Sequence, residues 1–184
     1  MTASSPTSSP TSTLPTPALQ HVLDLTVYVA APIEAGTVIG LNSRGKRRII
    51  PITGGSVQGQ INGQVLPGGA DFQIVVSETT ADLDARYMIE LDNGEHIFVQ
   101  NRALRRGSAA DIAKLVRGEH VAPETIYFRC VPTFEVSSPA LEWLTQSIFV
   151  GTGARFPDRV QLSIFRLAEC QSESISTNRS GIFG

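Results

Sequence analysis

Carboxylates, guanidinium groups and phenols recur at strand-like spacing in this 184-residue chain. Asp84 and Arg86 are two residues apart, as are Tyr127 and Arg129, so each pair shares one face of an extended strand. If such faces point into a closed sheet, an Asp can exchange a proton while an Arg or Tyr stabilises an enolate or carbonyl oxygen. Residues of these types, held among Phe, Ile and Val, are typical of a small-molecule pocket.

Asp71 is the carboxylate with the most distinctive position. It follows the turn signal Leu66-Pro67-Gly68-Gly69 and starts the next strand-like run, where a curving sheet would close. We expect Asp71 to be the catalytic acid/base, Arg86 the oxyanion partner and Tyr127 a second donor, all facing one cavity. The expected substrate-binding residues are Phe72, Asp84, Asn101, Arg129, Phe134 and Trp143. The alternative is that the spaced polar pairs form a structural network or a solvated outer face.

Other kinds of site find little support in the sequence. The three histidines, His21, His96 and His120, are far apart and lack metal-ligand spacing, so we expect no metal site. The chain lacks a nucleotide fingerprint and a nucleophile elbow, and we expect it to work without a cofactor. The arginine-rich run 101–107 is expected to be a solvated loop, with an anion or carboxylate clamp as the alternative.

The overall composition limits the class of protein. The net charge of −2 and the pI of about 5.9 argue against nucleic-acid binding, which usually needs a basic domain. Charged residues are only 17% and the mean hydropathy is +0.03, which fits a sheet-rich domain with an apolar interior. The sequence shows neither a membrane span nor a signal peptide, and its two cysteines, Cys130 and Cys170, are expected to be reduced thiols in a cytoplasmic protein.

Both ends of the chain have the composition of tails. Residues 1–18 are almost wholly Ser, Thr and Pro, and residues 171–184 are similarly polar. Such segments bury too little apolar surface to offset the entropy lost on folding. We therefore expect two flexible tails flanking a single folded domain at 19–170.

A period of two dominates the body of the chain. About ten short runs alternate apolar and polar residues, and Asp92-Asn93-Gly94 is a good hairpin turn between two of them. The expected strands are 22–29, 37–40, 47–52, 56–60, 64–66, 71–77, 84–91, 96–101, 125–131, 147–151 and 160–167. One helix is expected at 108–117, where Ser108 is the N-cap, and one or two helical turns at 139–145.

Many strands joined by short turns predict an all-β, mainly antiparallel fold. A closed barrel of about eight to ten strands with one short helix is favoured, and a two-sheet sandwich is the alternative. Closure is favoured because six glycines permit the sharp bends that a barrel needs. They lie at positions 54, 55, 59, 63, 68 and 69.

The order of several segments resembles the family catalogued as domain of unknown function 3237. The matching segments are Gly45–Gly55, Gly63–Gln73, Leu83–Tyr87, Tyr127–Glu135, Trp143–Leu144 and Phe149–Gly153. The resemblance covers about 25–167 and implies a small lipocalin-like β-barrel of a kind found in bacteria and fungi, with no settled activity. Phe72 replaces the usual Trp of the family, and Asn93 departs from its usual Asp-Asp-Gly turn.

Two classes of function agree with these observations. The first is a cofactor-independent isomerase, cyclase or lyase that acts by acid/base chemistry on an apolar, oxygenated small molecule of secondary metabolism, polyketide-like or aromatic. The second is a non-catalytic, lipocalin-like carrier or sensor of such a molecule. In either case the expected partner is a small-molecule ligand, with no nucleic acid and no membrane. Assembly as a homo-oligomer stays open.

Overall fold

The computed structural model describes residues 14–41 and 43–169 and has ten strands, most of which alternate buried and exposed residues. The strands are β1 (Ala18–Val29), β2 (Ile33–Ile39), β3 (Arg44–Gly59), β4 (Gly63–Val65), β5 (Ala70–Val75), β6 (Thr80–Leu91), β7 (His96–Arg106), β8 (Tyr127–Val136), β9 (Phe149–Arg155) and β10 (Arg159–Ala168). The helical elements are α1 (Ala109–Val116) and two short 3-10 helices, η1 (Pro123–Thr125) and η2 (Pro139–Leu144).

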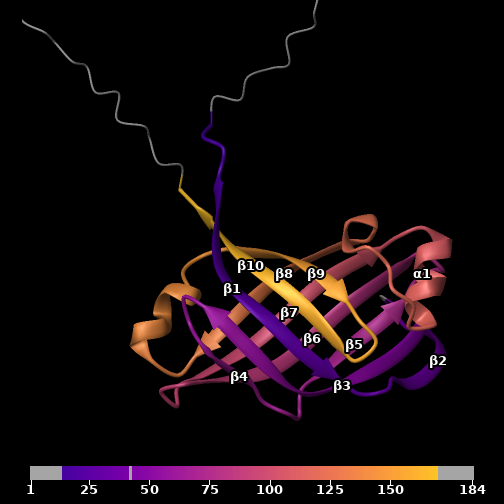
Figure 1. Ribbon diagram of the computed structural model, residues 1–184, viewed down its shortest axis with the longest axis horizontal. Coiled ribbons are helices and arrows are strands. Elements are labelled where there is room, and N and C mark those ends of the chain that lie inside the picture. The colour runs from indigo at the N-terminus through magenta and orange to yellow at the C-terminus, as the bar shows by residue number, and fades with distance from the viewer. Residues whose placement is uncertain (1–13, 42, 170–184) are drawn as a thin grey trace, which may run out of the picture.

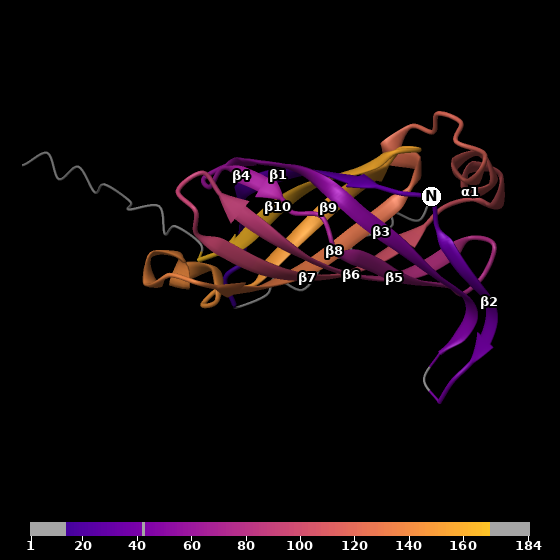
Figure 2. The same ribbon diagram turned by 90° about the horizontal axis from the view of Figure 1, so that it is seen from below.

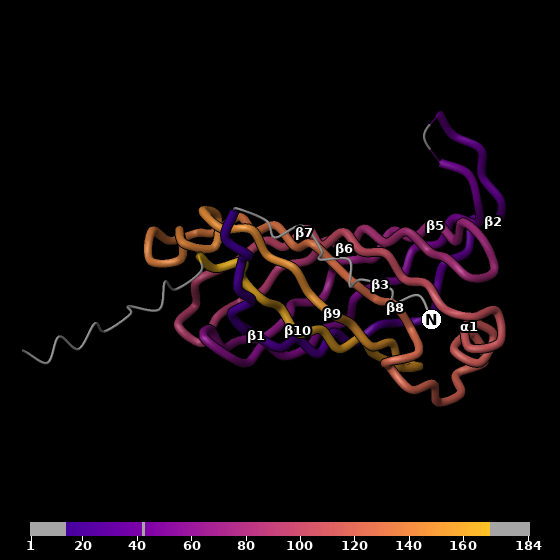
Figure 3. Tube along the Cα trace, turned by 90° about the horizontal axis from the view of Figure 1, so that it is seen from above, coloured from indigo at the N-terminus to yellow at the C-terminus, as the bar shows by residue number. Residues whose placement is uncertain are grey.

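These strands form a closed antiparallel barrel with eight positions (Figure 1). Around the barrel the order is β1-β10-β9-β8-β7-β6, then β4 and β5 in one position, then β3. Pairing of β1 with β3 completes the ring. Strand β2 pairs only with β3, and the two project from the barrel as a hairpin arm (Figure 2, Figure 3). The closed barrel predicted from the sequence is confirmed.

Glycine permits the close approach of β1 and β3 where the ring closes. A Cβ on Gly55 would lie 2.0 Å from the carbonyl oxygen of Thr26, and one on Gly59 would lie 2.4 Å from that of Val22. Both glycines have positive φ angles, 157° and 144°, which L-residues with side chains rarely adopt. The glycine-rich stretch therefore brings two backbones together as well as bending the sheet.

Apolar side chains fill the barrel from alternate positions of each strand. On β8, for example, Phe128, Cys130, Pro132 and Phe134 are buried, while the residues that alternate with them are exposed. The same alternation puts Leu83, Tyr87 and Ile89 of β6 inside. The parity of each strand therefore decides which polar residues enter the interior.

The two ends of the barrel differ. One end is plugged by η2 and by the ring of Phe149, whose centroid lies 5.1 Å from that of Phe134 and 6.2 Å from that of Trp143. The opposite end carries α1 and the β2 arm (Figure 1). Ser108 caps α1 by accepting a hydrogen bond from the backbone N–H of Asp111, as its sequence predicts. An apolar ligand is thus excluded from the η2 end by packed side chains.

The main differences from the sequence prediction concern element boundaries. Residues 47–52 and 56–60 form one strand, β3, because its glycines bend the strand without ending it. Residues 101–106 belong to β7, so the solvated loop expected there is wrong. The first strand starts at Ala18. Residues 1–13 and 171–184, on which nearly all of the two predicted tails fall, lie outside the described residues.

Candidate functional site

Charged side chains enter the barrel at the end that carries α1 and β2. Asp71 and Gln73 point inward from β5, Arg105 from β7 and Arg155 from β9, and together they line a pocket of about 300 Å³. We call this the mouth pocket. Its remaining lining is largely apolar: Val29, Ala30, Ala31, Pro32, Ile50, Leu83, Phe156, Pro157, Asp158 and Val160. Strand alternation explains the position of Arg105, because it has the same parity as the buried Val99 and Asn101.

A second, smaller space lies deeper inside the barrel and shares Asp71 with the mouth pocket. Its volume is about 40 Å³, and its other polar residues are Tyr87 and Asn101. We call it the inner cavity. Its apolar walls are Val27, Val29, Ile52, Leu83, Ala85, Ala103, Phe128, Val160 and Leu162. This volume accommodates a substituent of a ligand, while the mouth pocket has room for its main body.

Four buried side-chain atoms have no hydrogen-bond partner among the described residues, and all four belong to these two spaces. They are Asp71 Oδ1, Tyr87 Oη, Asn101 Oδ1 and Arg105 Nε. A buried polar atom without a partner costs about 1–3 kcal/mol. Such groups are uncommon in folded proteins, and their gathering around these two adjoining spaces makes the spaces the candidate site.

Gln73 holds Asp71 in place through a short chain of hydrogen bonds. Arg48, inward-facing on β3, donates from Nε to Gln73 Oε1 over 2.9 Å. Gln73 in turn donates from Nε2 to Asp71 Oδ2 over 2.5 Å. The β3–β5 register creates this arrangement, because it pairs Arg48 with Gln73. One carboxylate oxygen of Asp71 is thereby fixed, and the other is buried without a hydrogen-bond partner among the described residues.

The surroundings shift the pKa values of the inward-facing groups. Burial raises the pKa of Asp71 and outweighs the opposing effects of the Gln73 hydrogen bond, of Arg105, of the Asp84 backbone and of Arg48. Burial, with repulsion from Arg155 and Arg48, lowers the pKa of Arg105 to about 9, so this guanidinium is still charged at neutral pH. Burial also raises the pKa of Tyr87, which keeps its phenol protonated as a donor. The site combines a carboxyl of raised proton affinity with a crowded positive field.

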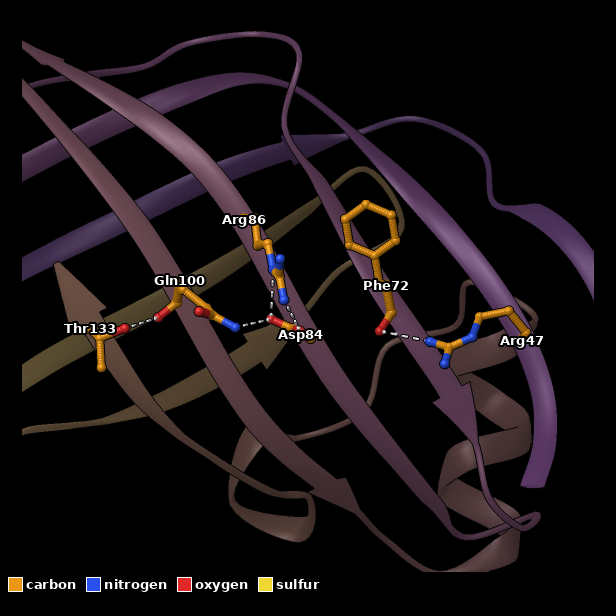
Figure 4. Close-up of polar contacts among 6 residues, drawn as sticks. All are labelled: Arg47, Phe72, Asp84, Arg86, Gln100 and Thr133. Carbon is orange, nitrogen blue, oxygen red and sulfur yellow. Dashed lines mark hydrogen bonds and ion pairs between the residues drawn. The ribbon is translucent and has the colours of Figure 1, made fainter. Parts of the chain in front are cut away.

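Of the three expected catalytic residues, only Asp71 faces the cavity. Arg86 lies on the outer face of β6, where its Nη2 is 2.9 Å from Asp84 Oδ2, and Gln100 also donates to Asp84 (Figure 4). Tyr127 is 46% exposed on β8. The expectation that Arg86 and Tyr127 share a cavity with Asp71 is wrong, because both have the outward parity of their strands.

The expected substrate-binding residues are divided among three places. Asn101 lines the inner cavity. Phe134 and Trp143 belong to the apolar plug at the η2 end, on the far side from the mouth pocket. The others lie on the outer face: Phe72, Asp84 and Arg129. Phe72 is 39% exposed on the outer face of the barrel. Its backbone carbonyl accepts a hydrogen bond from Arg47 Nη1 (Figure 4).

The structure adds five inward-facing residues to the site: Arg48, Gln73, Tyr87, Arg105 and Arg155. The alternation of side chains along each strand could have identified them from the sequence. Asn101 and Arg105 are four residues apart on one strand, as Asp71 and Gln73 are two apart, so each pair had to share a face. The alternative of an anion clamp in the arginine-rich run agrees with the inward position of Arg105.

Two further searches of the described residues bear on the kind of site. Residues 14–41 and 43–169 contain no cluster of three or more His, Cys, Asp or Glu arranged to bind a metal ion. In the same ranges, no helix has the length and apolar character to cross a membrane. Cys130 is a buried free thiol whose pKa is raised to about 11 by burial, so it is a poor nucleophile at neutral pH.

Comparison with known proteins places the chain in a family. Residues 17–167 match the model described as "Protein of unknown function (DUF3237)". A UPF0311 protein of Rhodopseudomonas palustris is 42% identical over 154 residues, which is 83% of this chain and 98% of the relative. Its crystal structure, described as a conserved protein of unknown function, superposes with a TM-score of 0.76 over the same shares of the two chains.

Other solved structures extend this likeness. An Acinetobacter baumannii protein described as "beta-barrel like" is 38% identical, with 83% of this chain and 97% of that one covered and a TM-score of 0.71. An enzyme from Penicillium herquei has a TM-score of 0.58 over 85% of this chain and 99% of that one, but at 18% identity it shows a shared fold alone. On the family match and the 42% identical relative, this chain belongs to the DUF3237 family.

Proposed function

We propose that this protein is a cofactor-independent isomerase or cyclase that uses acid/base chemistry on an apolar, oxygenated small molecule, polyketide-like or aromatic. The observation that carries the proposal is the position of Asp71. Its carboxyl group lies on both the mouth pocket and the inner cavity, with one oxygen held by Gln73 and the other unpartnered. A fixed carboxyl with raised proton affinity, next to a guanidinium, has the properties of a general base.

The arrangement supports proton abstraction next to a carbonyl group. Asp71 Oδ1 takes the proton, the C–H bonding pair moves toward the carbonyl, and the negative charge develops on the carbonyl oxygen. Arg105, whose Nε has no partner among the described residues, supplies positive charge for that oxygen. Return of the proton from Asp71 to another carbon gives an isomer. Alternatively, the enolate carbon attacks a second carbonyl carbon of the same molecule, the π bond of that carbonyl breaks, and the new alkoxide takes the proton from Asp71, which closes a ring.

The deeper polar groups position the substrate. Tyr87 Oη can donate a hydrogen bond and Asn101 Oδ1 can accept one, so together they recognise a hydroxyl or carbonyl substituent that enters the inner cavity. The mouth pocket, at about 300 Å³, is at the small end of ligand sites and fits one or two fused rings. The enzyme from Penicillium herquei shares this fold, which supports a catalytic role for such a barrel.

We further propose that the protein acts in the cytoplasm. A buried free thiol at Cys130 fits the reducing conditions of the cytoplasm. The proposed reaction needs no partner beyond its small-molecule substrate, because every group that it uses lies in one chain.

The test is exchange of the α-protons of 2-tetralone, an enolisable aromatic ketone, in deuterated buffer. The wild-type protein should accelerate exchange, and Asp71→Asn should slow the catalysed rate by about 10²–10⁴-fold. Asp84→Asn, which removes a carboxylate from the outer face, is the matched control and should leave the rate unchanged. Equal rates in wild type and Asp71→Asn would refute this role of Asp71. Saturable binding without any exchange would instead indicate the carrier or sensor.

A further inference from the structure

We propose that Arg105 and Arg155, backed by Arg48, form a subsite for a carboxylate, so that the ligand of the barrel is a small organic acid with an apolar body. This inference rests on the proposed function only in using the same pocket, and it names the substrate class. The acidic group would lie in the mouth pocket and the apolar body against its hydrophobic wall.

The three arginines come from separate strands and converge on one end of the interior. Arg105 is 4% and Arg48 8% exposed, and Arg155 is partly buried. The charges of all three act on one another: Arg48 and Arg155 both disfavour the charged form of Arg105, and Arg48 that of Arg155. Like charges in a low-dielectric interior are costly, so the fold concentrates positive charge here at the expense of stability.

Carboxylates of the protein do not neutralise this cluster. Asp71 is the one buried carboxyl that lines the mouth pocket, and burial raises its pKa. Asp158 also lines it but is mostly exposed and pairs with Arg159 over 3.0 Å. Glu34, 4.0 Å from Arg48, has a side chain that is 55% exposed. Three guanidinium groups therefore have one buried carboxyl, that of Asp71, to offset their positive charge at the mouth pocket.

Two surface arginines contrast with this cluster. Arg86 pairs with Asp84, and Arg117 with Glu119, both at the surface. Within the described residues, by comparison, the guanidinium groups of Arg105 and Arg155 have no hydrogen bond and no ion pair. Arg48 is hydrogen-bonded to Gln73, but the other two inward-facing arginines are unpaired, and an unpaired charge inside a barrel is too costly for a purely structural role.

The rest of the pocket distinguishes an organic acid from an inorganic anion. Val29, Ile50 and Val160 line the mouth pocket beside the arginines, together with the ring of Phe156. A planar guanidinium binds carboxylate through two parallel hydrogen bonds, and an adjacent apolar wall favours a hydrocarbon body. Inorganic phosphate would satisfy the charge but would leave the apolar wall uncovered.

The experiment is a set of binding titrations by calorimetry with benzoate, with its neutral counterpart benzamide and with inorganic phosphate. Wild type should bind benzoate at least about tenfold more tightly than either of the others. Arg105→Gln and Arg155→Gln should each weaken benzoate binding by about tenfold or more. Arg102→Gln is the matched control, because Arg102 lies on the same strand as Arg105 but faces outward.

A companion variant separates this inference from the proposed function. Asp71→Asn removes the negative charge next to the cluster, so it should tighten benzoate binding several-fold even though it should slow proton exchange. Equal binding of benzoate and benzamide, tighter binding of phosphate, or an equal loss in Arg102→Gln would overturn the carboxylate subsite. If Arg105→Gln does not fold, Arg155→Gln still decides the question, because Arg155 is only partly buried.

Discussion

Asp71 and Arg105 line the same end of the barrel interior, and each has one buried atom with no hydrogen-bond partner among the described residues. Those atoms are Asp71 Oδ1 and Arg105 Nε. The two residues come from β5 and β7, on either side of β6, so the barrel's curvature brings them to one pocket. Asp71 favours the charged form of Arg105, and Arg105 that of Asp71, but burial dominates both groups. Several predictions about stability and activity depend on this relationship.

The first prediction concerns the pH dependence of stability. The pKa of Asp71 is raised in the folded protein, so its protonated carboxyl contributes to the free energy of unfolding. This contribution is fully present below the ordinary pKa of 3.8 and is lost as pH rises through the raised pKa. Asp71→Asn resembles the protonated form and cannot lose that contribution. Urea unfolding from pH 3.5 upward should therefore show the stability of the variant rising relative to that of wild type as the pH rises. The difference should then reach a plateau. A constant difference between the two proteins would contradict the raised pKa.

A second prediction concerns the repulsion among the arginines. Arg155→Gln removes a partly buried charge whose pKa is lowered by burial and by Arg48. The free energy of unfolding at pH 7 should stay equal or rise, by up to about 1 kcal/mol, because repulsion and desolvation are relieved. Chemical denaturation measures this directly. A loss of more than about 1 kcal/mol would mean that Arg155 is a structural residue.

The apolar plug at the η2 end leads to a third prediction. Phe149 is 1% exposed and contacts the rings of Phe134 and Trp143, so Phe149→Ala should cost about 3–5 kcal/mol. Tyr127→Ala, on the outer face of β8, should cost no more than about 1 kcal/mol. Fluorescence of Trp143, the single tryptophan, reports both unfolding transitions. Similar costs for the two variants would show that the plug is loosely packed.

A fourth prediction tests how the barrel closes. Gly55→Ala places a Cβ 2.0 Å from the carbonyl oxygen of Thr26, so β1 and β3 must separate, at a cost above about 4 kcal/mol. Gly94→Ala, in the β6–β7 turn, meets nothing within 4 Å, and its φ of 84° adds only about 1–2 kcal/mol of strain. Midpoints of urea unfolding should rank the variants in that order. The reverse order would exclude close approach as the role of Gly55.

Much of the fold could be predicted because its signals are local. The Ser108 N-cap, the Asp92-Asn93-Gly94 turn and the period-two runs each depend on a few neighbouring residues. The exact strand boundaries could not be predicted in the same way. β3 continues through Gly54 and Gly55 because two neighbouring strands pair with it there, and pairing between distant segments has no local signature.

The candidate site could be predicted only in part, for a related reason. A spacing of two shows that Asp84 and Arg86 share a face, but it does not show which face is inside. Apolar neighbours supply that information: Leu83 and Tyr87 are inside, so Asp84 and Arg86 are outside. Three arginines in seven residues predict a solvent-exposed loop around Arg105. Its burial depends on the mouth pocket, which forms only when β5, β7 and β9 meet.

The most direct measurement is the pH profile of kcat/KM for 2-tetralone proton exchange by wild type, Asp71→Asn and Asp84→Asn. Asp71 is faced by Arg48 from β3, Arg105 from β7 and Arg155 from β9, with Tyr87 from β6 deeper inside. If Asp71 is the base, the wild-type rate should rise with pH through a single group whose pKa is above 3.8 and then level off. This rise should persist in Asp84→Asn and disappear in Asp71→Asn. The same rise in Asp71→Asn would contradict the account, because the proton would then be taken by another group.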